Sequence, residues 1–395
     1  MIISLLTGGG EKHYQLGLIS GLARHDLIIE VIGSDKMAGS EELNKNNIRF
    51  INLRGDQNYN SNLFNKILRI VKYYLKLFNY VMKTDSKLFH IQWLNKFYFF
   101  DRTLLTLFYK VMGKKLVFTV HDVDKNKVVT EDYYTKNEKK QYNGYFSTKL
   151  MYNLVDCLIV HNNRVKKEII ENYRISGEKI VTIPHGINPL GLTNDVSSKD
   201  ARNKLNISTD KKVILFFGNI AANKGLEILL DCFNDLIETD GRYFLIIAGA
   251  PRIKQDTYIA SIVERINKVK KEYILSNLTF IPDGDIKYYF MSADCLVLPY
   301  KFVYQSGVTY LAYSFGLPVI ATDVGNFREE IVEGETGFIS RNNNKESFKL
   351  AIEEYFNSNL YKNIIQTRIS IKEYAVSNYS WDKIADTHLS AYNKL

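Results

Sequence analysis

Short apolar runs separated by longer amphipathic stretches constrain the fold of this 395-residue chain more than any other feature. They form two series, the first at residues 2–6, 28–32, 88–91, 116–120, 157–160 and 180–183, and the second at 213–217, 244–248, 278–281, 295–298 and 318–321. Runs without polar alternation are typical of parallel strands buried on both faces. Helical patterns between them, such as 226–237 and 256–271, supply covering helices. The sequence therefore predicts an α/β protein with two doubly wound parallel sheets.

The break between the two series lies at residues 188–212, which contain Pro189, Gly191 and a polar cluster with one short helical piece. Such a composition is typical of a linker between domains. We therefore expect an N-terminal domain at 1–190 and a C-terminal domain at 191–375. Residues 376–395 read as a terminal helix, which we expect to return to the N-terminal domain.

Composition excludes several classes of protein. No apolar run reaches the ~18 residues of a membrane span, and the first seven residues lack the features of a signal peptide. The three cysteines, Cys157, Cys232 and Cys295, form neither a zinc pattern nor a disulfide framework, so we expect a cytoplasmic protein. The formal net charge of +9 suits nucleic acid, anionic lipid or a phosphorylated ligand. Because no nucleic-acid recognition motif accompanies the charge, we expect no nucleic-acid partner.

Two segments that follow first strands carry residues suited to phosphate binding. Thr7-Gly8-Gly9-Gly10 opens a helix, where Gly9 and Gly10 let a ligand approach the backbone; a tight turn explains the glycines equally well. In the second series, Gly218 allows a sharp exit from the strand and Lys224 lies at the start of the next helix. An ammonium there can neutralise a diphosphate together with the helix dipole, although a solvated lysine is the alternative.

The most informative segment runs from Cys295 to Phe338. Gln305-Ser306-Gly307-Val308 opens a helix, G-L-P-V-I-A-T-D-V-G follows at 316–325, and E-G-E-T-G-F ends the segment at 333–338. Together with His121 after the strand at 116–120, I-P-H-G-I-N at 183–188 and the Lys224-Gly225 turn, this pattern resembles the retaining glycosyltransferases of family four (glycosyl transferases group 1). The resemblance covers nearly the whole chain.

This resemblance implies the GT-B fold, in which two Rossmann-like domains face a central cleft. It implies that the N-terminal domain binds the acceptor and the C-terminal domain the nucleotide-sugar donor. His121 would orient the donor sugar, and Lys224 would stabilise the leaving diphosphate, with no metal and no cofactor besides the co-substrate. The donor-binding residues implied are Gly9, Gly10, Gly218, Asn219, Lys224, Gln305, Ser306, Gly307 and Val308.

The sequence also departs from the family pattern. Val303 and Leu311 occupy the places of two glutamates that the family commonly has, and Asn219 replaces an arginine. The Q-S-G-V loop resembles a subgroup of the family. The missing glutamates leave open a non-catalytic GT-B subunit that binds glycan or peptide for a partner glycosyltransferase, with an inverting enzyme or an epimerase as a further alternative.

Two other motifs receive structural interpretations. His185 fits the interdomain hinge better than catalysis. Asp122-Val123-Asp124 matches the Asp-x-Asp metal motif of a different glycosyltransferase fold, a three-residue match that arises easily by chance.

Residues 62–84 form a basic amphipathic pattern, with Lys66, Arg69, Lys72 and Lys76 on the polar side. Such a helix suits an anionic membrane surface, and a surface helix packed on the sheet is the equal alternative. A second aromatic and basic stretch at 133–149 favours a lipid-linked acceptor. We therefore expect a glycan or polyprenyl-diphosphate-linked acceptor, a role in bacterial surface polysaccharide assembly, and peripheral contact with the inner membrane face.

Overall fold

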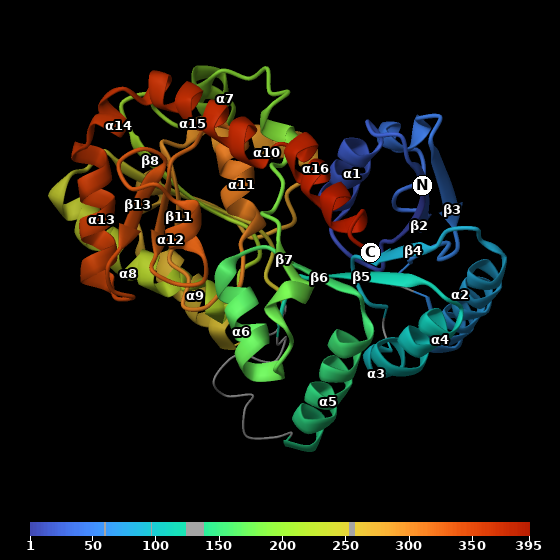
Figure 1. The fold of residues 1–395 in the computed structure, drawn as a ribbon. Coiled ribbons are helices and arrows are strands. Elements are labelled where there is room, and N and C mark those ends of the chain that lie inside the picture. Colours follow the sequence, from blue (N-terminus) through green and yellow to red (C-terminus); the bar gives the residue numbers. More distant parts are fainter. Residues whose placement is uncertain (59–60, 96, 124–137, 253–256) are drawn as a thin grey trace. The chain divides into compact units, whose positions relative to one another are not determined.

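The computed structural model describes residues 1–58, 61–95, 97–123, 138–252 and 257–395. They form two compact units (Figure 1). Unit 1 comprises the described residues up to Gly186 together with Tyr379–Leu395, and unit 2 comprises the described residues of Ile187–Asn378.

The described part of unit 1 contains a seven-stranded parallel sheet in the order β3-β2-β1-β4-β5-β6-β7. Ile3 pairs with Ile29 on one side and with Leu88 on the other, so the strand order reverses between β1 and β4. The strands are β1 (Ile2–Leu6), β2 (Ile28–Gly33), β3 (Ile48–Asn52), β4 (Leu88–Ile91), β5 (Lys115–Val120), β6 (Cys157–Val160) and β7 (Ile180–Thr182).

Helices cover both faces of this sheet. The face with Ile3 and Leu5 packs against α1 (Lys12–Leu22) and α16 (Trp381–Tyr392). On the other face, the Ser4 hydroxyl lies 2.7 Å from the Tyr80 hydroxyl of α2 (Leu63–Lys83). The remaining helical segments are Glu41–Asn44, α3 (Tyr98–Phe100), a π-helical turn at Asp101–Leu105, α4 (Thr106–Val111), α5 (Glu138–Leu154), α6 (Asn163–Tyr173) and Gly177–Lys179.

The described part of unit 2 contains a six-stranded parallel sheet in the order β10-β9-β8-β11-β12-β13, so the order reverses between β8 and β11. One face packs against α8, α9 and α13, and the other contacts α10, where the Phe217 and Phe290 rings lie 4.9 Å apart. The strands are β8 (Lys212–Phe217), β9 (Tyr243–Ala248), β10 (Ile274–Asn277), β11 (Cys295–Leu298), β12 (Val319–Thr322) and β13 (Gly337–Ser340). The helices are α7 (Ser198–Lys204), α8 (Leu226–Thr239), α9 (Thr257–Lys268), α10 (Asp283–Ser292), α11 (Gly307–Ser314), α12 (Phe327–Glu330), α13 (Lys345–Asn357), α14 (Asn359–Lys362) and α15 (Ile364–Tyr379), with 3₁₀ turns at Pro189–Gly191, Ala222–Lys224 and Lys271–Tyr273.

The predicted fold class of two doubly wound parallel sheets is confirmed, but one predicted strand is wrong. The strand expected at 278–281 is β10, which ends at Asn277. The Asn277 side-chain oxygen accepts hydrogen bonds from the amide and hydroxyl of Thr279, and this turn ends the strand. Phe280, an apolar residue of the predicted strand at 278–281, is 76% exposed, so the apolar pattern there does not mark a buried strand. The sequence analysis also missed β3 and β13, the edge strands that lie next to β2 and β12.

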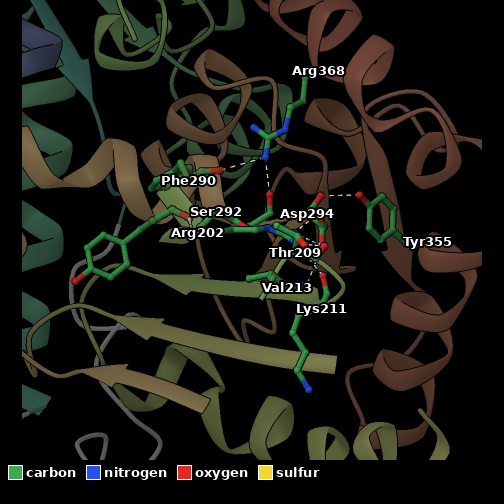
Figure 2. Close-up of polar contacts among 11 residues, drawn as sticks. Arg202, Thr209, Lys211, Val213, Phe290, Ser292, Asp294, Tyr355 and Arg368 are labelled. Atoms are coloured by element: carbon green, nitrogen blue, oxygen red, sulfur yellow. Dashed lines mark hydrogen bonds and ion pairs between the residues drawn. The ribbon is translucent and has the colours of Figure 1, made fainter. Parts of the chain in front are cut away.

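A buried ion pair joins helices to the amino end of the unit 2 sheet (Figure 2). The Nη2 atom of Arg202, on α7, lies 3.0 and 2.9 Å from the two carboxylate oxygens of Asp294. This carboxylate also accepts from the Val213 amide, and the Asp294 carbonyl accepts from the Tyr355 hydroxyl of α13. Arg368 of α15 donates to neighbouring carbonyls. Through its carboxylate and its backbone carbonyl, Asp294, which precedes β11, thus connects β8, α7 and α13.

Removal of one partner of this pair should be strongly destabilising. Arg202→Met leaves the Asp294 carboxylate buried without its cation, a change that typically costs ~3–5 kcal/mol. We expect a loss of that size in the free energy of unfolding measured with urea. The control is Arg242→Gln, which removes a pair whose arginine is 59% exposed and should leave stability unchanged. Equal effects of the two variants would contradict the assigned role of Arg202.

Candidate functional site

Each sheet has one point at which its strand order reverses, and ligands of doubly wound folds bind outside the carboxyl ends of strands at such points. In unit 1 this point lies between β1 and β4, where Gly8, Gly9 and Gly10 follow β1. In unit 2 it lies between β8 and β11, where Gly218 follows β8. The predicted donor-binding residues therefore lie in loops that begin at the switch points.

In unit 2, the segment after β8 is held against the loop after β11. Gly225 has φ +63°, and a Cβ there would lie 1.9 Å from the Pro299 carbonyl oxygen, so only glycine permits this approach. The Lys301 amide donates to the Asn223 carbonyl at 2.9 Å, and the Asn223 side chain donates to the Phe302 carbonyl at 3.2 Å. These contacts fix the two loops relative to each other.

Lys224 lies in the 3₁₀ turn before α8, two residues ahead of Leu226, rather than within the helix itself. Its ammonium lies 3.8 Å from the centroid of the Tyr300 ring, a cation–π contact. The Tyr300 hydroxyl in turn lies 3.5 Å from the Ser306 hydroxyl. Tyr300 was not singled out from the sequence, although an aromatic residue directly after a strand-ending proline is a usable signal.

The other predicted residues of unit 2 surround this cluster. A Cβ at Gly218 would lie 3.6 Å from Cγ2 of Val308. Gly307 begins α11, and the Ser306 side chain does not cap that helix. The Gln305 side-chain nitrogen is buried and, among the described residues, has no hydrogen-bond partner. Asn219 is exposed. The structure thus brings Gly218, Lys224, Ser306 and Val308 together around one loop pair.

Beneath α11 lies a buried carboxyl group that the sequence analysis missed. Glu330 accepts a hydrogen bond from the Tyr310 hydroxyl at 2.6 Å and another from the Asn326 side chain. Burial raises the pKa of Glu330 to about 8, so the group is protonated over most of the range below that pH. No local sequence pattern separates Glu330 from the exposed Glu329 beside it.

In unit 1, His121 follows β5 and stacks on Trp93 with ring centroids 3.8 Å apart. Burial lowers the pKa of His161 to about 3, so His161 is neutral. Its Nδ1 lies 3.0 Å from the Ile183 carbonyl and must donate to it, which makes its Nε2 an acceptor. The His121 Nδ1, 3.2 Å away, must therefore carry a proton and donate to it.

Tyr14, buried on α1, is the centre of an aromatic cluster around His121. Its ring lies 5.1 Å from that of His121, and burial raises its pKa. Its other neighbours at 5.0–5.6 Å are Trp93, His161, His185 and Trp381. The cluster excludes water from one side of His121 and fixes its ring.

The three glycines after β1 are explained by different contacts. A Cβ at Gly10 would lie 2.0 Å from the Trp93 ring, and a Cβ at Gly8 would lie 2.3 Å from the Trp93 carbonyl oxygen. Packing against Trp93 therefore requires both glycines. At Gly9 the nearest atom to a Cβ is Nη2 of Arg54, at 3.6 Å, so its backbone is the more open of the three.

Helix α2 confirms the amphipathic pattern at 62–84 but turns much of its apolar side outward. The exposed apolar residues are Leu63, Phe64, Ile67, Leu68, Val71, Leu75 and Met82. Phe78 lies 4.8 Å from Phe108 of α4, whose neighbours Leu107 and Val111 are also exposed. No described helix combines the length and apolarity needed to cross a bilayer. Of the predicted stretch 133–149, the side chains of 133–143 lie outside the described residues, and Tyr145 and Phe146 are exposed.

The Asp-x-Asp match is described only in part. Asp122 is exposed, and Asp124 lies outside the described residues. Among the residues described, no three His, Cys, Asp or Glu side chains gather in a way that could hold a metal ion.

Comparisons with known proteins match both halves of the chain. The family model "Glycosyltransferase Family 4" matches residues 7–189, and "Glycosyl transferases group 1" matches residues 197–375. An uncharacterized glycosyltransferase of Methanocaldococcus jannaschii is 24% identical over 60% of this chain and 59% of its own length. A D-inositol 3-phosphate glycosyltransferase of Corynebacterium aurimucosum is 25% identical over 57% of this chain and 54% of its own length. The chain thus spans less than two thirds of these relatives.

Among solved structures, HepE of Anabaena in complex with UDP has a TM-score of 0.72 and covers 100% of both chains at 14% identity. HepE has also been crystallised with UDP-glucose. At this identity the likeness shows the fold, which is that of GT-B glycosyltransferases.

The raised pKa of Glu330 makes stability depend on pH. Because the folded state holds a proton that the unfolded state releases above its usual pKa of 4.5, the stabilisation is complete below pH 4.5 and is lost as pH rises to about 8. The slope approaches ~1.4 kcal/mol per pH unit. We expect Glu330→Gln to flatten the urea-unfolding free energy over this window, whereas Glu335→Gln, on the surface, keeps the wild-type slope. A parallel profile for Glu330→Gln would contradict the assignment.

Proposed function

We propose, from the premise that this chain belongs to the group 1 glycosyltransferases, that it moves a sugar from a nucleotide-sugar donor to an acceptor with retention at the anomeric carbon. The observation that carries this proposal is the Lys224 ammonium, held on Tyr300 beside Ser306 at the switch point of unit 2. The binding of UDP and UDP-glucose by HepE supports a donor of this class. The Q-S-G-V loop would replace the missing glutamates in holding the donor.

In the proposed reaction, the bond between the anomeric carbon and the diphosphate breaks, and the acceptor oxygen attacks on the same face. The departing phosphate oxygen takes the acceptor proton, so no protein nucleophile is needed. Lys224 stabilises the charge that develops on the diphosphate, while Ser306, Gln305 and the backbone at Gly218, Asn219, Gly307 and Val308 position it. This ammonium supplies the neutralisation without a metal, and no cofactor takes part besides the nucleotide-sugar.

His121 acts on the sugar rather than on the diphosphate. Because Nδ1 donates to His161, Nε2 is the nitrogen through which the neutral ring accepts a hydrogen bond from a sugar hydroxyl. Trp93 and Tyr14 hold the imidazole in the required plane. Gly9 and Gly10 keep the adjoining turn close to the ligand.

The proposed acceptor is a glycan carried on a polyprenyl diphosphate at the inner membrane face, in bacterial surface polysaccharide assembly. Its support is the exposed apolar side of α2, which is flanked by the exposed basic residues Lys72 and Lys76. An apolar surface with adjacent lysines suits a bilayer that contains anionic lipid.

Lys224 should matter more in the transition state than in the ground state. We expect Lys224→Ala to lower kcat/KM by ~10²–10³, mostly through kcat, as the loss of one preorganised donor does. The matched control is Lys211→Ala, because the Lys211 ammonium donates to the Gly241 carbonyl near the amino end of β8, away from the site. Steady-state transfer from UDP-, GDP- and dTDP-sugars measures both variants.

The same assay in excess EDTA should keep its rate. Full turnover by Lys224→Ala would move the diphosphate site to the Gln305-Ser306-Gly307 loop. Neither transfer nor donor hydrolysis by the intact chain would favour the non-catalytic subunit instead.

Membrane contact through α2 should weaken with salt and with charge reversal. Each basic residue near an anionic surface contributes ~1 kcal/mol, so we expect Lys72→Glu with Lys76→Glu to reduce binding to phosphatidylserine-containing vesicles by more than about tenfold. The control is Lys270→Glu with Lys271→Glu, exposed lysines of unit 2. Equal vesicle binding in both double variants would show that α2 is only a solvated surface.

A further inference from the structure

Unit 1 contains a pocket whose lining residues have no role in the sugar transfer proposed above. It is a small pocket of approximately 30 Å³ that opens to solvent, and it is lined by the segment after β3, by α2 and by the segment after β4. Since all three elements approach at the carboxyl end of the sheet, the pocket lies at the ligand-binding edge of unit 1.

Among the described residues, three cations and no carboxylate line this pocket. Arg54 donates to the Asn95 side chain at 2.8 Å and lies 5.3 Å from the Tyr73 ring centroid, so its guanidinium is preoriented. Arg69 donates to the Asn58 carbonyl at 3.2 Å. Lys66 has no carboxylate within ion-pairing distance in the described part of the chain.

Nearby acids offset little of this charge. Asp56 lies 3.5 Å from Arg69 but is largely exposed. Asp101 lies behind Tyr74, whose hydroxyl donates to it at 2.6 Å, and burial raises the pKa of Asp101. Three clustered cations repel one another unless a multiply charged anion lies between them. Guanidinium groups with an ammonium are the groups that proteins use for phosphate.

The pocket is linked to the His121 cluster along the same edge of the sheet. The Arg54 guanidinium lies against Gly9, and Asn95 is two residues from Trp93, which stacks on His121. An anionic group bound at Arg54 therefore lies in the loops next to the group that we assign to the sugar.

Helix α2 separates the pocket from an apolar surface. Lys66, Arg69 and Tyr73 are lining residues, whereas Ile67 and Leu68, one and two residues beyond Lys66, are exposed. A ligand with a phosphate head and a hydrocarbon chain matches both sides of this helix.

We propose that the pocket binds the diphosphate of a lipid-linked acceptor through Arg54, Lys66 and Arg69, with the hydrocarbon chain on the exposed apolar side of α2. This assignment rests on the proposed function and gives its acceptor a site. It separates the acceptor diphosphate from the donor diphosphate, which belongs to Lys224 of unit 2.

The first test measures binding of inorganic pyrophosphate to the full chain by isothermal titration calorimetry. The titration is done in the Lys224→Ala background, which weakens the donor-site contribution. We expect Arg54→Gln and Lys66→Gln each to weaken binding by about tenfold, as loss of a charge-assisted contact does. Lys66→Arg should retain binding, and Lys83→Gln, an exposed lysine at the end of the same helix outside the pocket, should have no effect. Unchanged affinity in Arg54→Gln and Lys66→Gln would overturn the site.

The second test identifies the source of the phosphate. Geranylgeranyl diphosphate, below its aggregation concentration, should bind at least about tenfold tighter than pyrophosphate, and Ile67→Gln with Leu68→Gln should remove that gain. Equal affinity for the two probes would overturn the lipid assignment in favour of a soluble phosphorylated acceptor. Vesicles of anionic phospholipid that displace pyrophosphate as effectively as geranylgeranyl diphosphate would overturn it in favour of a headgroup site.

UDP binding separates failure of this site from failure of the proposed function. The pocket variants should keep wild-type affinity for UDP, whereas Lys224→Ala should weaken it only modestly, because most of its effect falls on kcat. If wild-type protein binds pyrophosphate in the pocket but neither binds UDP nor transfers sugar, the proposed function is wrong and the anion site stands. Loss of UDP affinity in Arg54→Gln would overturn the separation of the two diphosphate sites.

Discussion

Parallel strand pairing is the constraint on which the rest of this structure depends. Every described pairing in both sheets is parallel, so each crossover returns over a face, and all strands of a sheet end at the same edge. Both faces are thereby covered, and the loops with functional side chains gather at the carboxyl edge. The Arg202–Asp294 pair lies at the amino edge, where its burial stabilises the fold without restricting access to a ligand.

Most strands predicted from the sequence, such as β1 and β11, have apolar runs buried on both faces. The analysis missed β3, where exposed and half-buried residues mix, and β13, which is buried but begins with glycine and ends with serine, and it misplaced β10 because Phe280 is apolar and exposed. The loops of unit 2 were located correctly because Gly218 and Lys224 follow a clear strand. The contacts within these loops were not predicted, because the position of Lys224 over Tyr300 depends on packing between segments some 75 residues apart.

Close packing explains Gly10, which the sequence analysis assigned to ligand binding, and Gly225, the neighbour of Lys224. Gly10 accommodates the Trp93 ring, and Gly225 accommodates the Pro299 carbonyl. Glycine at these positions allows the neighbouring segments to pack closely. Of the three glycines after β1, only Gly9 leaves room beside its backbone, where Arg54 is the nearest residue. A glycine-rich turn after a strand thus predicts a site more reliably than it predicts which glycine touches the ligand.

The positively charged side chains at the amino and carboxyl edges of the sheets lie in different environments. At the amino edge of unit 2, Arg202 is buried and paired with a carboxylate, so it contributes order rather than affinity. At the carboxyl edges, Lys224 rests on an aromatic ring, as does Arg54, and neither has a carboxylate partner among the described residues. An aromatic face holds a cation in place without neutralising it. These two cations therefore keep their charge for an incoming anion, one in each unit, as the proposed reaction between a nucleotide-sugar donor and a diphosphate-linked acceptor would require.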